Sequence, residues 1–350
     1  HRPHSHDGQA GRTEGGMMAL TGTRPRPFPG RLNPPAAVWV VLLLFCVFAM
    51  AVPRFASAGN LENLLRVGSI LGIAACGQTI VLILGGIEFS FGASAALASV
   101  VTVLALPSAG VAGGFAAGAA SVLLVGLVNG TLVARFSLPP FLVTLGMLMV
   151  AGGGAAVLAG GLPIDAPPSD AFSWPARGRI AGIPVPILAA AASFALLHLL
   201  LGHTRAGRLW YLVGANGTAA RLSGITVWRS VLAGYLVAGA FCALAAVILT
   251  SRVASGQPGL APNLPFETIA ACAVGGIPLA GGQGRAVQTL CGVLVIAMLN
   301  NAVVLLNLPV AYQQLMIAAV ILGAVLLQQA PRLLLLLPVR PARQPEEERS

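Results

Sequence analysis

Long apolar segments recur along the whole chain and are separated by short gaps that are polar or rich in glycine. A helix needs about 20 apolar residues to cross a bilayer, and roughly 17 to 25 are tolerated. Ten segments fit or approach this length: 37–53, 62–84, 93–110, 112–134, 139–160, 184–201, 230–251, 266–280, 288–306 and 311–329. We therefore predict an all-α protein, a polytopic transmembrane helical bundle of about ten spans. The eighth segment is short and interrupted by glycine, so a re-entrant or discontinuous helix is the alternative to a full crossing there.

The remaining segments define the predicted organisation of the chain. Residues 1–36 form a polar tail rich in Arg and Pro, residues 37–330 form one transmembrane domain, and residues 331–350 form a second tail. Two connecting loops are longer than a turn, at 161–182 and 202–229. A short echo joins the two parts of the domain, because residues 127–130 read LVNG and residues 299–302 read LNNA. Repeated halves are common in transporters.

The composition excludes most soluble classes. Hydrophobic residues make up 57% of the chain and charged residues only 9%, whereas soluble domains are about 25% charged. All 20 basic residues are Arg, and no Lys is present. A P-loop that binds ATP requires a Lys after its glycines, so the chain has no such site of its own. The five cysteines lie in apolar segments without a C-x-x-C pair, and we expect buried free thiols and no metal site.

The distribution of Arg predicts the orientation in the membrane. With ten spans and both termini in the cytoplasm, the Arg residues that fall outside are Arg54, Arg66, Arg177, Arg179 and Arg252. The other 15 fall inside, as the excess of positive charge in cytoplasmic loops requires. Arg residues confined to the gaps between spans are typical of membrane topology and not of nucleic-acid binding.

Polar residues within the apolar segments are the candidates for a translocation path or a gate. Glu88 and Glu267 are the carboxylates nearest to membrane depth, where an acidic side chain costs about 2.5–3.5 kcal/mol and indicates a functional role. For both we favour a gating role over direct contact with the solute. The other candidates are Gln78, Phe91, Asn129, Asn300 and Asn301. Polar contacts between helices are the alternative role of the amides, and core packing is the alternative role of Phe91.

The loop at 202–229 carries the most specific pattern. Residues 203–208 read HTRAGR and residues 214–225 read GANGTAARLSGI. Asn216 or Thr218 can cap a short helix that Gly224 ends. The pattern resembles the coupling loop of membrane permease subunits in bacterial ABC importers of the ribose and monosaccharide type, within the branched-chain amino acid and ribose permease superfamily. A plain topology-setting loop is the alternative.

Three more motifs agree with this resemblance in the same order. Residues 85–92 read GGIEFSFG and are similar to the family's G-I-D-L-S-V-G, with Glu88 in place of its Asp. Residues 141–147 read FLVTLGM and are similar to F-I-x-T-L-x-M. Residues 267–285 are similar to the family's E-L-D-A-I-A-A…G-G-T-S-L-A-G-G-K-G-R, with Thr, Pro and Gln as departures at 268, 278 and 283.

The resemblance implies a function and a set of partners. The chain would be the permease subunit of an importer that moves ribose or another monosaccharide across the bacterial inner membrane, and it would not itself be an enzyme. A separate ATPase subunit would bind ATP and Mg, a periplasmic protein would deliver the sugar, and a second permease subunit would complete the path as a homodimer or a heterodimer. The residues that would contact the ATPase are Ala219, Ala220, Arg221, Leu222, Ser223, Gly224 and Ile225.

Two questions stay open at this level. An ion-coupled secondary transporter of a small polar solute is the alternative function, since intramembrane acids also couple transport to protons or sodium. The departures from the family motifs leave the transported sugar open.

Overall fold

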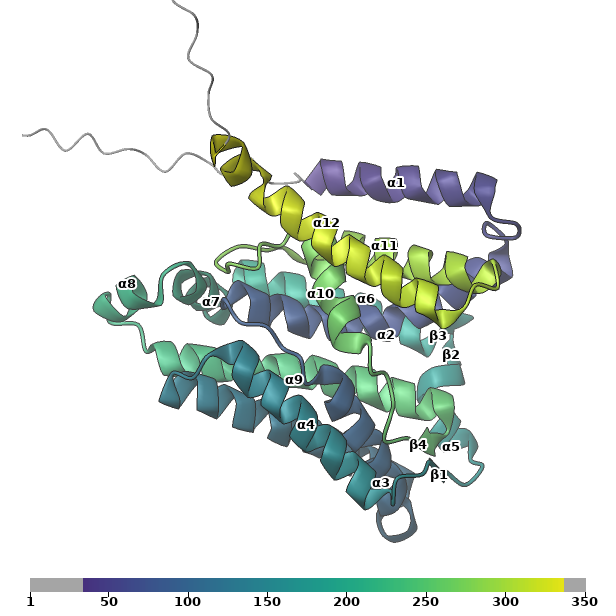
Figure 1. Ribbon diagram of the computed structural model, residues 1–350. Coiled ribbons are helices and arrows are strands. Elements are labelled where there is room, and N and C mark those ends of the chain that lie inside the picture. The colour runs from purple at the N-terminus through teal and green to yellow at the C-terminus, as the bar shows by residue number, and fades with distance from the viewer. Residues whose placement is uncertain (1–33, 337–350) are drawn as a thin grey trace, which may run out of the picture.

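A computed structural model describes residues 34–336 (Figure 1). Within that range the chain forms twelve helices and four strands of two residues each. The helices are α1 (Pro34–Ala51), α2 (Ala58–Ile83), α3 (Phe91–Phe136), α4 (Pro140–Leu158), α5 (Asp170–Arg177), α6 (Val185–His203), α7 (Arg205–Ala215), α8 (Gly217–Leu222), α9 (Val227–Val253), α10 (Leu264–Val274), α11 (Ala286–Leu305) and α12 (Val310–Leu336). The strands are β1 (Ile164–Asp165), β2 (Arg179–Ile180), β3 (Ile183–Pro184) and β4 (Ser255–Gly256).

The helical, polytopic character of the chain is confirmed. Among the described residues, six helices are long and apolar enough to cross a membrane: α2, α3, α4, α6, α9 and α11. Three shorter apolar helices lie in α1, α10 and α12. Every predicted span overlaps one of these nine helices, but the count of ten and the cytoplasmic location of both ends stay predictions. Most of the two predicted tails falls in residues 1–33 and 337–350, outside the described residues.

Helix α3 contains two of the predicted spans. Its 46 residues bend sharply at Gly110, where φ is 67° and ψ is −175°. A side chain disfavours this backbone conformation and glycine does not, so the chain reverses there. The residues before and after Gly110 form two arms, which match the predicted segments 93–110 and 112–134.

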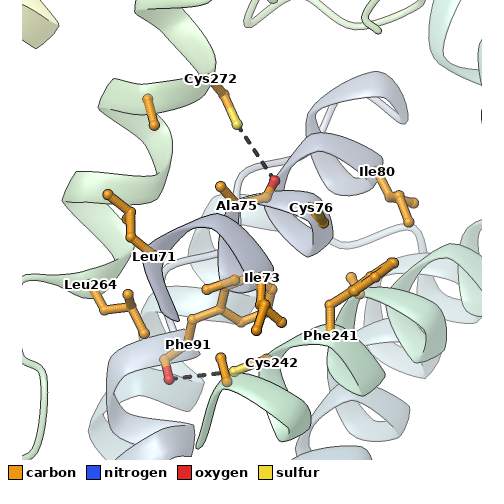
Figure 2. Packing of buried hydrophobic residues seen from close by; sticks show 14 of the residues in the cluster. Leu71, Ile73, Ala75, Cys76, Ile80, Phe91, Phe241, Cys242, Leu264 and Cys272 are labelled. Atoms are coloured by element: carbon orange, nitrogen blue, oxygen red, sulfur yellow. Dashed lines mark hydrogen bonds between the residues drawn. The ribbon is translucent and has the colours of Figure 1, made fainter. Parts of the chain in front are cut away.

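Helix α2 is the centre of the bundle. All of its residues from Gly68 to Ile83 are buried, because α6, α9, α10 and α11 surround it. A Cβ added at Gly77 would lie 2.7 Å from the carbonyl oxygen of Ala238, so the backbones of α2 and α9 touch. Figure 2 shows the packed side chains, with Ile73 of α2 beside Phe91 of α3 and Phe241 of α9. Small residues allow such close approach inside a membrane.

Two irregular segments interrupt the bundle and end beside one another. Residues 84–90 join α2 to α3, and residues 257–263 join β4 to α10. A Cβ at Gly92 would lie 2.5 Å from the carbonyl oxygen of Ala261, and the rings of Phe89 and Phe266 are 6.1 Å apart. The first turns of α3 and α10 therefore meet inside the protein, where irregular backbone is tolerated because protein surrounds it.

The two long loops mark opposite ends of the bundle (Figure 1). At the right in that view, β1 pairs with β4 and β2 pairs with β3. Helix α5 packs there on α9, and the ring of its Phe172 stacks on Phe115 of α3 at 4.9 Å. The short helices α7 and α8 lie at the left end. The loop at 161–182, predicted only to be longer than a turn, thus contains a short helix that a buried aromatic side chain holds in place.

The order of elements supports the repeat that the sequence echo predicts. Helix α2, the two arms of α3 and α4 are followed later by α9, α10, α11 and α12. Both α3 and α11 end at a left-handed residue, Ser137 with φ 55° and Asn307 with φ 52°, and Leu-Pro follows each. The sequence GGI also occurs twice, at 85–87 and 275–277, but not at equivalent places: residues 85–87 follow the first helix of one half, whereas residues 275–277 follow the second helix of the other.

Candidate functional site

The predicted path residues fall into two separate clusters. Gln78, Glu88, Phe91 and Asn129 gather where α2 gives way to α3, and all four are buried. Glu267 and Asn300 gather between α10 and α11, beside an open cavity. Asn301 lines this cavity as well.

In the first cluster, the carboxylate of Glu88 is held by three donors. It accepts from the backbone N–H of Ser90 at 2.7 Å and from the Ser90 hydroxyl at 2.5 Å. The Asn129 amide, which comes from the second arm of α3, donates to it at 3.1 Å. Because Glu88 precedes the first turn of α3, the positive end of that helix also stabilises its negative charge.

Neighbouring side chains form hydrogen bonds with backbone groups of the irregular segment around Glu88. The Gln78 amide lies against the backbone of Glu88. In the amide orientation that matches donors to acceptors, its N–H donates to the carbonyl of Glu88 at 3.1 Å and its oxygen accepts from the Glu88 N–H at 3.3 Å. The hydroxyl of Thr144, on α4, donates to the carbonyl of Ile87 at 2.9 Å. Phe91 packs in the apolar core with Ile73 and Phe241 (Figure 2). These contacts suit a rigid support for the break between α2 and α3.

In the second cluster, Glu267 faces a cavity of about 340 Å³. Its carboxylate accepts from the amide of Asn300 at 3.3 Å and from the amide of Gln313 at 3.2 Å. The carbonyl oxygen of the Asn300 side chain has no protein partner. Asn301 instead exchanges two hydrogen bonds of 2.9 Å with Asn60. This cavity combines apolar walls with amide and carboxylate groups that can bind hydroxyls.

Several polar residues of this cavity are absent from the candidates that the sequence indicates. They are Asn63, Arg252, Asn263 and Gln313. Gln313 lies inside the apolar segment 311–329, which is the signal that selected the other amides. Arg252 and Asn63 lie at helix ends, where polar residues are ordinary, so only the tertiary structure identifies them.

The two clusters repeat one arrangement in the two halves of the chain. In each, a Glu near the start of an interrupted helix accepts a hydrogen bond from an Asn: Asn129 donates to Glu88 and Asn300 to Glu267. The first pair is sealed, since Glu88 is 2% exposed. The second pair opens to the cavity, at the end of the bundle where α11 finishes and α12 begins.

At the opposite end, α8 presents the predicted coupling residues. Asn216 caps the helix by accepting from the N–H of Ala219 at 2.9 Å, so the predicted cap is Asn216 and not Thr218. Gly224, with φ 80°, follows its end as predicted. Ala219, Arg221, Leu222, Ser223 and Gly224 are exposed, Ile225 is half-buried and Ala220 is buried. Leu222 is 86% exposed, which leaves an apolar side chain free for a partner.

Helix α7 connects α8 to the core. A Cβ at Gly214 would lie 1.8 Å from the carbonyl oxygen of Ile83, the last residue of α2, and that oxygen accepts from the N–H of Gly282 at 2.8 Å. The hydroxyl of Tyr211 donates to the carbonyl of Gly284 at 2.6 Å. Burial raises the pKa of Tyr211, which keeps this donor protonated, although nearby Arg285 opposes the shift. A displacement of α7 and α8 would therefore reach the end of α2 directly.

The expectations for cysteine and metal need one correction. Cys76, Cys242, Cys272 and Cys291 are buried free thiols as predicted, but Cys46 is exposed. It lies on α1, which packs on the rest of the bundle mainly through α11, so part of its surface is uncovered. No group of three or more potential metal ligands occurs among residues 34–336.

Comparison with known proteins extends these observations. Residues 60–325 match the family described as branched-chain amino acid transport system / permease component. Ribose import permease protein RbsC of Escherichia coli (strain K12) is 36% identical over 82% of this chain and 90% of its own length. RbsC of Bacillus subtilis (strain 168) is 38% identical over 83% and 90%. The L-arabinose ABC transporter permease protein AraH of Azospirillum brasilense is 33% identical over 86% and 89%. No solved structure matches the chain.

Proposed function

The chain belongs to the family of branched-chain amino acid transport system / permease components, and from this we propose that it is the permease subunit of an ABC importer for a sugar. The observation that carries the proposal is its similarity to ribose permeases of two bacteria over 82–83% of its length. The sugar would be ribose or a related monosaccharide such as L-arabinose, and the location would be the inner membrane of a bacterium.

The cavity beside Glu267 supports a polyhydroxylated solute. Its amide and carboxylate groups can hydrogen-bond hydroxyls, and it offers about 340 Å³ of space. Sugar sites that bind tightly usually add aromatic stacking, and none of the residues around this cavity is aromatic. The permease would therefore bind its solute weakly, and a separate periplasmic protein would supply the affinity.

We assign the transport energy to partners. Without a Lys the chain cannot complete a P-loop, so a separate ATPase subunit would bind ATP and Mg. It would dock on α8 through Arg221 and Leu222. ATP-driven movement of α8 would pass through Gly214 to the end of α2 and shift the sealed and the open clusters between two states. A second permease subunit, either identical or homologous, would complete the path through the membrane.

Uptake in whole cells tests the function. A bacterial strain that lacks sugar importers would express this chain with its ATPase and its binding protein, and uptake of labelled ribose and L-arabinose would be measured. We expect uptake that stops when ATP is depleted and continues when an uncoupler dissipates the proton gradient. Uptake with the opposite response would assign the chain to the ion-coupled transporters.

Arg221 tests the coupling assignment. We expect Arg221→Glu to abolish uptake with a normal amount of protein in the membrane, because the change inverts a charge at the proposed ATPase contact. The matched control is Arg221→Lys, which keeps the charge and should keep most of the uptake. Normal uptake by Arg221→Glu would show that α8 does not dock through this residue.

A further inference from the structure

A small cavity of about 10 Å³ lies next to Glu88. It is bounded by the irregular segment before α3, both arms of α3, and α9. Its polar lining consists of Glu88, Ser90, Ser94, Asn129 and Tyr235. Glycines contribute to the wall at Gly126 and Gly239, where the backbones of α3 and α9 approach each other.

Three polar atoms of this lining have no hydrogen-bond partner within residues 34–336: Ser94 Oγ, Asn129 Oδ1 and the Tyr235 hydroxyl. Each belongs to a side chain that is at most 2% exposed. Buried polar atoms are nearly always paired, so three orphans around one cavity require an explanation.

The carboxylate of Glu88 also has one position left. Its two oxygens offer about four acceptor positions, and Ser90 and Asn129 occupy three of them. The cavity is therefore lined by two groups that need a donor, Glu88 and the Asn129 carbonyl. It is also lined by two hydroxyls that need an acceptor, those of Ser94 and Tyr235.

We propose that this cavity binds a single water molecule. Water donates two hydrogen bonds and accepts two, so one molecule satisfies all four groups: it donates to Glu88 and Asn129 and accepts from Ser94 and Tyr235. A bound water needs roughly 10–15 Å³ and two to four polar partners, and the cavity supplies both. A monovalent cation is the rival occupant. A cation cannot accept the protons of the two hydroxyls. The three donors around Glu88 also already compensate the negative charge that would attract a cation.

The bound water would join the two halves of the protein. Tyr235 belongs to α9, in the second half, while Glu88, Ser94 and Asn129 belong to the first half. No direct hydrogen bond links the Tyr235 hydroxyl to that half. A bridge made by water, unlike a direct bond, can lengthen or exchange when α9 moves against α3 during transport.

A structure of the purified permease complex, at a resolution that shows ordered water, tests the proposal directly. We expect one density peak within hydrogen-bonding distance of Glu88, Ser94, Asn129 and Tyr235, unchanged when choline replaces Na⁺ and K⁺. An empty cavity would overturn the proposal. A peak that disappears with choline, or that gives an anomalous signal after soaking with Tl⁺, would replace water by a cation and overturn it as well.

Tyr235→Phe supplies an independent test, because Tm should fall if a water is bound and should not fall if the cavity is dry. If water is bound, the change removes a hydrogen bond and lowers Tm by about 2–4 °C. If the cavity is dry, the change removes an unpaired buried hydroxyl, so Tm stays equal or rises. Ser94→Ala should behave in the same way as Tyr235→Phe. The control is Ser121→Ala, since Ser121 bonds only the carbonyl of Gly118 in its own helix. A Tm that is unchanged or raised in both test variants would exclude the water.

Discussion

Two carboxylates inside the bundle, Glu88 and Glu267, show how one residue type serves two environments. Each lies near the start of an interrupted helix and accepts a hydrogen bond from an Asn of the following helix. Charged groups are expensive at membrane depth unless donors and helix termini compensate them. The donors around Glu88 hold its carboxylate in a sealed site, which suits a structural support for the break between α2 and α3. Glu267 shares an open cavity with other polar groups. This position suits contact with a passing solute, in place of the gating role that the sequence favoured for it.

Glu267 is the residue where a small change should affect transport most. We expect Glu267→Gln to lower the initial rate of sugar uptake by about tenfold. The new amide can still accept from Asn300 and Gln313 through its oxygen, but it loses the negative charge that strengthens both bonds and replaces an acceptor of the cavity by a donor. Uptake rates at several sugar concentrations, normalised to protein in the membrane, provide the measurement. Glu267→Asp keeps the charge and should retain more activity. Equal rates for wild type and Glu267→Gln would remove this residue from the path.

Among the helices, α8 depends most for its stability on the residues at its two ends. It contains six residues, and helices this short are not stable without caps or packing. Asn216 caps its start and Gly224 ends it, so the chain presents Arg221 and Leu222 in a defined orientation.

Removal of the cap should therefore weaken coupling. We expect Asn216→Ala to destabilise α8 by about 1 kcal/mol and to reduce sugar uptake and sugar-stimulated ATP hydrolysis in the reconstituted importer together. Asn216→Asp keeps a capping oxygen and is the control. The assignment of α8 as the contact would fail if Asn216→Ala left both rates unchanged.

The close approach of α10 and α11 gives a second prediction at this scale. A Cβ at Gly292 would lie 1.7 Å from the carbonyl oxygen of Ala271, so Gly292→Ala should reduce the yield of folded protein severely. Gly146, on α4, has no atom within 4 Å of its added Cβ, and Gly146→Ala should leave stability unchanged or raise it by about 0.4–1 kcal/mol. Size-exclusion profiles and Tm in detergent compare the two variants. Similar behaviour of the two would contradict the packing of α10 on α11.

For the whole molecule, the two ends of the bundle differ in structure. The open cavity beside Glu267 lies at one end, and α7 and α8 lie at the other (Figure 1). The backbone contact between Gly214 and Ile83 connects the second end to α2 at the centre. This separation fits an importer in which solute enters from one side and the driving partner acts from the other.

Chemical labelling tests that orientation. In a Cys46→Ala background, Ser223→Cys on the α8 surface should react with a membrane-impermeant maleimide only in inside-out vesicles, because loops rich in Arg stay in the cytoplasm. Arg54→Cys is the matched probe at the opposite end and should react in intact cells. Reaction of Ser223→Cys in intact cells would invert the proposed topology and exclude ATPase docking on α8.

Local patterns in the sequence predicted a large part of this structure. The length of each apolar segment predicted the helices, and Gly110 separated two of them at the observed bend. The order of Asn216, small residues and Gly224 predicted α8 because capping depends only on neighbouring residues. The same reasoning was wrong for Cys46, since an apolar segment in a membrane protein can face lipid as well as the core.

The sequence by itself determined that the chain is a helical membrane protein, roughly where its apolar helices lie, and which polar residues lie within apolar segments. These properties follow from the composition of short segments and from the thickness of the lipid layer that an apolar helix must cross. Only the tertiary structure decided how these polar residues pair. It separated Glu88 from Glu267, joined Asn60 to Asn301 across 241 positions, and placed Tyr235 beside an acid of the other half. Such pairs depend on how helices pack, and no local pattern encodes that packing.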